Sequence, residues 1–342
     1  MRYLHSFSGV IVLACSFVLA ACCFVREELP PCEHYLHFVY DHNMKFADAW
    51  QHEAEQVTLF IFDEEGKYLK EMNISAEEAR ANNILLTLEP GTYRMLAWSS
   101  LESGDYRCLA PADRSGSRIE DYHVQMNTDA DGTDGSRTVT RDLTPLFYGM
   151  QTVTIPATAG SDIRFPLMKD TNTFRLIVQT NADGAAGSTV PSEEFEFSIT
   201  DDNALLAHDN AVTAESLPLT YLPYYLGTGD IHDTGGNVVQ TATCAELNTN
   251  RLTYGTHPRL TILHKPTGKV WLDVDLIEYL MLMPTEGSLD KMLDREHPRQ
   301  EYLDREDEYV IVFFFTQGTG GSMVNLWINI NGWSVRINHI EM

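Results

Sequence analysis

Four residues near the amino terminus, Leu19-Ala20-Ala21-Cys22, have the types and the order of a bacterial lipobox. In this motif the cysteine thiol receives a diacylglycerol, and the small residues let a peptidase reach the bond before the cysteine. The preceding apolar run, residues 10–21, follows Arg2 in the manner of a secretory signal and is short for a transmembrane helix. We therefore predict that residues 1–21 form a lipoprotein signal peptide and that Cys22 is the lipidated residue.

Other interpretations of this segment remain open. An ordinary signal peptide could precede a chance cysteine, a second box could end at Cys23, and the apolar run could be a buried helix.

Acylation of the new amino terminus would add further chains, and two or more acyl chains make an anchor stable. Residues 22–33 would then be a lipidated spacer, since Glu27 and Glu28 are followed by "LPPC", whose prolines favour an extended chain. Acids just after the lipid site resemble the surface-export signal of lipoproteins in some Gram-negative anaerobes.

The remaining cysteines are spaced widely. Outside the cytoplasm a disulfide is permitted, and a bond between Cys32 and Cys108 would link the spacer to the first domain. The chain has no CxxC motif, so neither a zinc ribbon nor a thioredoxin-like site is indicated.

Catalytic motifs are absent or incomplete. His52-Glu53-Ala54-Glu55-Gln56 begins like the zinc motif HExxH but ends in glutamine, and no GxSxG, P-loop or GxGxxG occurs. The 12 histidines lack metal-ligand spacing, and no carboxylate pair stands out among the acids. The formal charge of −25 is wrong for nucleic-acid binding by counter-ion release. The sequence predicts a protein that is not an enzyme and binds no metal, cofactor or nucleic acid.

After the spacer, sequence patterns typical of β-strands dominate the chain. Alternating and aromatic or β-branched runs predict strands at residues 35–40, 57–63, 93–99, 145–156 and 162–168. Two short helices are expected, one within residues 44–56 and one that starts at Ser75 with a capping box and ends near Asn82. Residues 104–135 form a long polar stretch without a strong strand signal.

A second block of strands follows the tetrapeptide Lys169-Asp170-Thr171-Asn172, which is the expected domain junction. Strands are predicted at residues 173–180, 194–200, 259–265, 270–276 and 309–315, with a charged and partly helical segment before the last of these. The carboxyl-terminal run forms a hairpin around Asn331-Gly332, a sequence that type I′ turns prefer. Two successive strand-rich blocks predict an all-β protein of two tandem β-sandwiches, residues 34–170 and 171–342, with short helices in the connections.

The ordered set of sequence blocks is similar to the FimB-like (minor-fimbria anchor type) fimbrial anchor lipoproteins of Gram-negative gut and oral anaerobes. The resemblance covers nearly the whole chain, and "YDHNMKFADAW" is its most specific part. Lys169 departs from it, because an arginine is expected there. The matching blocks are the lipobox with "REELPPC" and residues 36–50, 57–69, 88–98, 145–149, 167–178, 301–315 and 333–341.

The resemblance implies two transthyretin-like domains and a lipid-anchored, surface-exposed position at the cell outer membrane. It also implies a role in anchoring a shaft of fimbrial subunits and limiting its length, with assembly by strand exchange. We expect the assembly strand at the carboxyl terminus, through Trp333, Val335, Ile337 and Ile340, although this strand could equally be core.

Two other classes of function remain. A surface glycan-binding lipoprotein would share the anchor and the sandwiches, and an exposed row of tryptophans would favour it. Buried tryptophans would favour the structural role, and the strand positions of Trp98, Trp271, Trp327 and Trp333 make core packing the simpler expectation. A surface hydrolase would need a cleft with paired acids, which no sequence pattern indicates.

Overall fold

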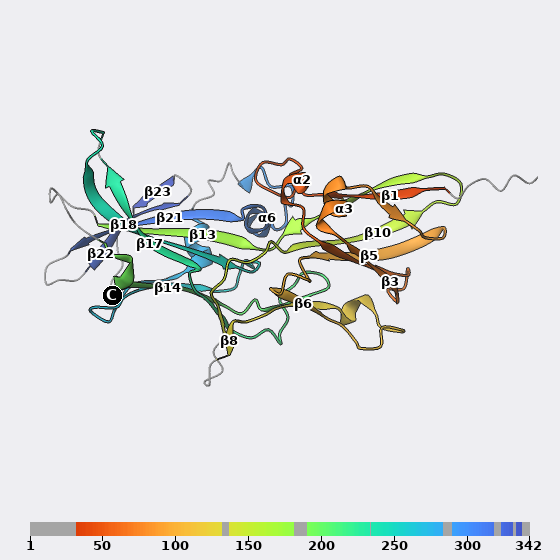
Figure 1. Ribbon diagram of the computed structural model, residues 1–342, viewed down its shortest axis with the longest axis horizontal. Coiled ribbons are helices and arrows are strands. Elements are labelled where there is room, and N and C mark those ends of the chain that lie inside the picture. Colours follow the sequence, from red (N-terminus) through yellow and green to blue (C-terminus); the bar gives the residue numbers. More distant parts are fainter. Residues whose placement is uncertain are drawn as a thin grey trace, which may run out of the picture.

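The protein is an elongated stack of β-sheets with a few short helices, so the predicted all-β class is confirmed (Figure 1). The structure is a computed structural model, and it describes residues 32–131, 137–180, 190–232, 234–282, 289–317, 323–330 and 333–336. Among these residues no helix combines the length and the apolar character needed to cross a membrane.

The amino-terminal half has three layers (Figure 1). The outer layer is a three-stranded sheet in the order β11 (Ser161–Pro166), β1 (His34–Val39), β4 (Ile84–Leu86). The middle layer is a five-stranded sheet in the order β12 (Met168–Lys169), β10 (Phe147–Ile155), β5 (Gly91–Ser99), β2 (Val57–Phe62), β3 (Tyr68–Ile74). A small sheet of β15 (Leu205–Ala207), β7 (His123–Met126) and β6 (Tyr106–Leu109) covers its other face.

This layering explains the continuous apolar sequence of β2. Leu59 and Ile61 face the core shared with the outer layer, whereas Phe60 and Phe62 face the core beneath the small sheet. Because both faces of the middle sheet are covered, every residue of β2 is buried.

The carboxyl-terminal half is a two-layer sandwich. One six-stranded sheet has the order β17 (Tyr225–His232), β18 (Val238–Thr249), β13 (Asn172–Thr180), β21 (Glu308–Gln317), β22 (Met323–Ile330), β23 (Trp333–Arg336). The facing sheet has the order β20 (Lys269–Asp275), β19 (Arg259–His264), β14 (Phe195–Asp201), β16 (Leu219–Tyr221), β9 (Arg137–Val139), β8 (Ala130–Asp131). The alternating apolar residues of β14, for example Phe197 and Ile199, point into the core between the sheets.

The short helices lie in connections, as predicted. Helix α3 (Ala76–Ala81) begins with the expected capping box, in which Ser75 Oγ accepts from Glu78 N and Glu78 Oε2 accepts from Ser75 N. It ends at Asn82, which adopts a left-handed conformation with φ of 54°. The other helices of the described residues are α2 (Trp50–Glu53), α4 (Leu276–Leu280), α6 (Pro298–Arg305) and the 3-10 turns η1 (Ile119–Asp121) and η2 (Ser192–Glu194).

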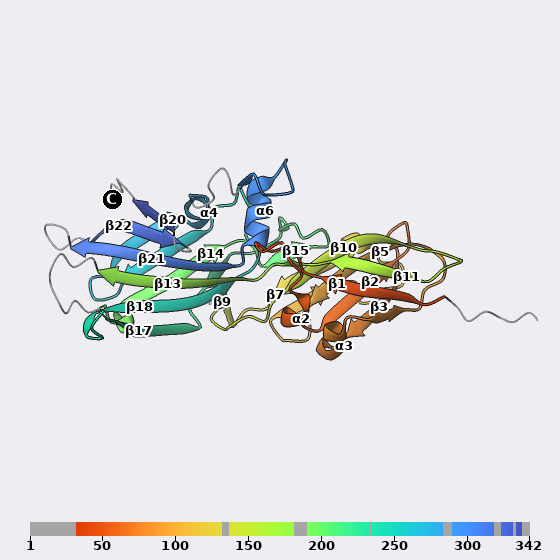
Figure 2. The same ribbon diagram turned by 90° about the horizontal axis from the view of Figure 1, so that it is seen from above.

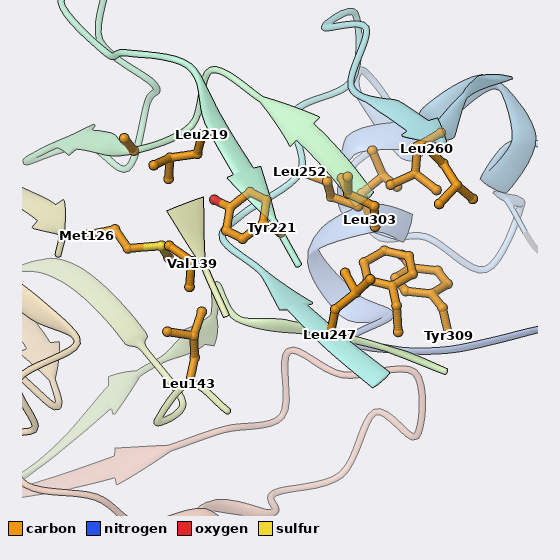
Figure 3. Close-up of a cluster of buried hydrophobic side chains, with 14 of the residues drawn as sticks. Met126, Val139, Leu143, Leu219, Tyr221, Leu247, Leu252, Leu260, Leu303 and Tyr309 are labelled. Atoms are coloured by element: carbon orange, nitrogen blue, oxygen red, sulfur yellow. The ribbon is translucent and has the colours of Figure 1, made fainter. Parts of the chain in front are cut away.

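The two halves exchange strands and share one core. Strand β15 comes from the second half of the sequence but pairs with β7, with Leu205 opposite Gln125. Strand β9 comes from the first half but pairs in parallel with β16, with Thr138 opposite Thr220. Side chains from both halves meet in a single cluster that includes Met126, Val139, Tyr221 and Leu247 (Figure 3). The predicted domain boundary after residue 170 remains a proposal. In the structure each of the two sequence blocks contributes a strand to a sheet of the other block.

Candidate assembly interface

The carboxyl-terminal hairpin occupies an edge of the larger sandwich. Strand β23 pairs antiparallel with β22, with Trp333 opposite Ile330 and Val335 opposite Ile328, as the hairpin prediction required. No strand of the described residues pairs with the other side of β23. An edge strand presents unpaired backbone groups, so this position suits the addition of a partner strand. Ile337 and Ile340, the other two predicted assembly residues, lie outside the described residues.

Strand β17 forms the opposite edge of the same sheet. It is mostly exposed, and its first residues Tyr225 and Leu226 are 50% and 39% exposed. The turn η2 packs against it, and Ser192 N donates to Thr228 Oγ1 at 2.8 Å. Because this edge is partly covered, it is a poorer candidate for strand addition than β23.

The predicted tether leads into the opposite end of the molecule. Cys22 lies outside the described residues, which begin at Cys32 immediately before β1. Strand β1 pairs in parallel with β11 from His34 to Val39, and His34 Nδ1 contacts Ser161 Oγ at 2.8 Å. Figure 1 shows the start of β1 at one end of the long axis and β22 with β23 in the half at the other end. The start of β1 and the edge strand β23 therefore lie in opposite halves of the elongated body (Figure 1).

The structure does not form the disulfide predicted between Cys32 and Cys108. Both residues are free thiols, and so is Cys244. Cys32 is exposed before β1, whereas Cys108 lies in β6 and packs against the shared core. Burial raises the pKa of the Cys108 thiol to about 12, so it stays protonated and unreactive at neutral pH. The strand β1 that follows Cys32 and the strand β6 that contains Cys108 belong to different sheets of the amino-terminal half. The spacing of the cysteines along the sequence could not reveal this separation.

The described tryptophan side chains do not form an exposed aromatic row. Trp98 is fully buried, and so is Trp50, whose Nε1 donates to Ala79 O at 2.9 Å. Trp271 is partly buried and packs on Phe195 and His264, with ring centroids 4.9 and 4.6 Å apart. The side chains of Trp327 and Trp333 are not among those described. For the three described rings the structure favours core packing over a carbohydrate platform.

A polar junction joins α6 to the amino-terminal half (Figure 2). Arg305 and Glu301 are each 5% exposed, and Arg305 Nε donates to Glu301 Oε1 at 2.6 Å. Arg305 Nη1 also donates to the carbonyl oxygens of Asp41 and Asn43, at 3.1 and 3.4 Å. The backbone completes the contact, because Met44 N donates to Arg305 O at 3.2 Å. One buried guanidinium thus connects the two halves.

Lys169, the residue that departs from the expected arginine, belongs to the same junction. Its Nζ lies 2.9 Å from Glu53 Oε2 and 2.7 Å from Asp307 Oδ2. Burial alone would lower the pKa of Lys169, but Asp307 and Glu53 raise it above its usual value. The lysine remains charged and bridges α2 to the segment before β21, so the departure keeps a cation at the junction.

A second buried network lies beside it. Asp170 accepts from Asn210 Nδ2 at 2.8 Å, and Arg251 donates to both carboxylate oxygens of Asp304 at 2.8 Å. Arg251 also donates to Asn210 O at 2.5 Å. Burial raises the pKa of the Asp170 carboxyl to about 7, against the opposing effects of Arg251 and the Asn210 N–H. No sequence pattern signalled this cluster, since its members are scattered over residues 170–304.

One group of possible metal ligands occurs among the described residues: His257, Asp275 and Glu278. Asp275 Oδ2 lies 2.6 Å from His257 Nδ1, and Asp275 Oδ1 accepts from Glu278 N at 3.0 Å as the cap of α4. Both oxygens of the central aspartate therefore already have protein partners, and two of the three side chains are exposed. This arrangement is explained by helix capping without an ion.

A family model matches most of the chain. The family model described as fimbrillin-A associated anchor proteins Mfa1 and Mfa2 matches residues 29–339. No match was found among curated proteins.

Solved structures from Bacteroides and Porphyromonas species have a similar fold. A candidate adhesin from Bacteroides thetaiotaomicron is 27% identical with a TM-score of 0.75, and the match covers 91% of this chain and 100% of that chain. A candidate polysaccharide-binding protein from the same organism is also 27% identical, with a TM-score of 0.73 and coverage of 90% and 98%. The fimbrial anchor protein Mfa2 from Porphyromonas gingivalis is 18% identical, with a TM-score of 0.65 and coverage of 90% and 99%.

Proposed function

Because the chain belongs to the family of fimbrillin-A associated anchor proteins, and so has a fimbrial accessory role, we propose that it tethers a fimbrial shaft to the outer membrane. The observation that carries this proposal is the placement of the two functional ends. The chain enters from the lipobox at the start of β1, and the open edge strand β23 lies in the opposite half of the elongated body (Figure 1). A subunit built in this way can hold a membrane at one end and a fibre at the other.

The membrane end of the proposal depends on Cys22. Signal removal after Ala21 would leave Cys22 as the first residue, with about ten residues of spacer before the described fold begins at Cys32. The lipid holds the protein at the surface, and the acidic chain gives little attraction to anionic lipid headgroups. The tether therefore relies on acyl chains.

Replacing Cys22 by alanine is expected to abolish lipid attachment and to move the protein from the membrane fraction to the soluble fraction. Metabolic labelling with a palmitate analogue, followed by membrane fractionation, measures both effects. Cys23→Ala is the matched control and should keep label and membrane position. If the C22A protein still carries the label while the C23A protein loses it, the lipidated residue is Cys23 instead.

The fibre end of the proposal depends on β23. A shaft subunit would add a strand to this edge, with backbone hydrogen bonds supplying affinity and the alternating side chains supplying specificity. Capping one end of a growing shaft in this way would also limit its length, because a tethered subunit occupies the terminal contact. No enzymatic activity enters this role.

Proline substitutions at β23 test the contact. In a strand the N–H and C=O of a residue point to the same side, and successive residues alternate. Of Ser334→Pro and Val335→Pro, one therefore removes an N–H that faces β22 and the other removes an N–H that faces outward. We expect the variant that lacks the outward-facing N–H to keep its thermal stability. In cells with this variant, fimbriae should no longer co-purify with the outer membrane.

Two controls make the result specific to this edge. Deleting residues 333–342 should also release the fimbriae, and Tyr225→Ala on the opposite edge should leave co-purification unchanged. Normal co-purification with both proline variants and with the deletion would overturn the β23 contact. The tether itself would survive that result, since the C22A experiment tests it separately.

A further inference from the structure

A buried carboxyl and a buried amide face each other where the chain passes between the two halves. Asp170 follows β12 and precedes β13, and Asn210 lies in the turn after β15 with φ of 66°. Both residues are 1% exposed. Asn210 Nδ2 donates to Asp170 Oδ1, but Asp170 Oδ2 and Asn210 Oδ1 are buried and have no hydrogen-bond partner.

The two unpaired atoms are complementary only if one of them carries a proton. An ionised carboxylate has no donor, so Asp170 Oδ2 and Asn210 Oδ1 would both remain unpaired acceptors in the interior. A neutral carboxyl has an O–H at Oδ2, and the amide oxygen of Asn210 is the vacant acceptor on the same partner side chain. Reciprocal pairing then satisfies both side chains, and buried polar groups pay a large penalty when they are left unpaired.

The charged surroundings do not supply a dedicated cation for Asp170. Arg251 is the cation that lowers the pKa of this carboxyl, but its guanidinium is bonded to Asp304 through two hydrogen bonds and to Asn210 O through a third. The other titratable groups that interact with this carboxyl are Asp304, which opposes its ionisation, and the buried phenols of Tyr106 and Tyr148.

We propose that Asp170 is a neutral carboxylic acid that forms a reciprocal hydrogen-bonded pair with Asn210, and that its ionisation releases this lock between the two halves. The pair joins the β12–β13 crossover to the turn after β15, the strand that crosses over to pair with β7. Through Asn210 O and Arg251 it also reaches Asp304 on α6. The lock therefore holds in acidic surroundings and weakens as pH rises through neutrality.

The direction of the pH effect follows from the raised pKa. Between the ordinary aspartate value of about 4 and the folded value of about 7, the unfolded chain is ionised while the folded protein keeps its proton. The folded state binds more protons in this range, so the contribution of Asp170 to stability is complete below about 4 and is lost as pH rises through about 7.

Asp170→Asn tests the lock because asparagine preserves both hydrogen bonds and cannot ionise. We expect the melting temperature of the native protein to fall, relative to that of D170N, as pH rises from about 5 to about 8. At matched pH near 8, amide exchange in residues 203–213 should be faster in the native protein than in D170N, and near pH 5 it should be equal. Asp209→Asn, at an exposed neighbouring aspartate, is the control and should retain the pH dependence of the native protein.

A direct measurement on the native protein removes any dependence on how the variant folds. Carbon-13 NMR of aspartate-labelled protein should show a carboxyl that titrates near pH 7 and whose signal is absent from the spectrum of D170N. An Asp170 signal that titrates near its ordinary value overturns the proposal, and so does an equal pH dependence of stability in the native protein and D170N.

Discussion

Replacing Trp50 by alanine is expected to lower the free energy of unfolding by about 3–5 kcal/mol. The ring is fully buried in the outer core of the first half, with centroids 5.5 Å from Phe38 and 5.2 Å from Phe147. Its Nε1 also donates to Ala79 O, so the ring joins α2 to α3. Truncation removes these contacts, leaves a cavity between β1 and β10, and leaves a buried carbonyl without its donor.

Chemical denaturation monitored by far-ultraviolet circular dichroism measures this loss. Trp50→Phe should fall between the native protein and W50A, because it keeps a ring but loses the indole N–H. Tyr225→Ala, at a half-exposed aromatic on edge strand β17, should change stability by no more than about 0.5 kcal/mol. Equal stabilities of W50A and Y225A would contradict the assignment of Trp50 to the core.

Replacing Arg305 by methionine is expected to lower the free energy of unfolding by about 3–5 kcal/mol. The substitution leaves Glu301 buried without its cation and removes the donor to the carbonyl oxygens of Asp41 and Asn43. The side chain also covers the Phe46 ring, with its guanidinium carbon 4.4 Å from the ring centroid. Because these contacts cross between α6 and the first half, we expect the loss to loosen the junction.

The matched control is Arg259→Met. Arg259 pairs with Asp273 on the exposed faces of β19 and β20, where an ion pair contributes at most about 1 kcal/mol. The double variant R305M/E301M should recover part of the loss, because it removes the uncompensated charge. A loss in R305M no larger than that in R259M would show that the junction does not depend on the buried guanidinium.

Several elements could be predicted because their signals are local. The capping box at Ser75 fixes α3 within a few residues, and the Asn331-Gly332 pair fixes the hairpin of β22 and β23. The apolar run of β2 needs no partner to be recognised as a strand. In each case a short segment contains the whole physical cause of the structure.

Other strands could not be predicted because their cause lies elsewhere in the chain. Strand β6 lies in a polar stretch and gains its order from pairing with β7 and from burial of Tyr106 beneath the middle sheet. Strand β17 contains Gly227 and Gly229 and is mostly exposed, so only its pairing with the long strand β18 makes it a strand. Four-residue and glycine-containing strands carry too little alternation to be distinguished from loops.

Some parts of the candidate site could likewise be predicted from the sequence, and others could not. The lipobox and the terminal strand are contiguous in sequence, so both could be proposed before any fold was known. The edge position of β23 depends on the order of six strands, and the contact between Asp170 and Asn210 depends on a return of the chain after 40 residues. Neither property has a sequence signature.

The parallel pairing of β1 with β11 has a mechanical consequence for a protein that is pulled from its amino terminus. Traction on the amino terminus acts along β1, which is held by β11 on one side and β4 on the other. The six residue pairs with β11 then resist sliding together, whereas strands pulled apart sideways would open one pair at a time. A subunit loaded between a membrane and a fibre would thus carry tension in shear, and its first point of failure should be the extraction of β1.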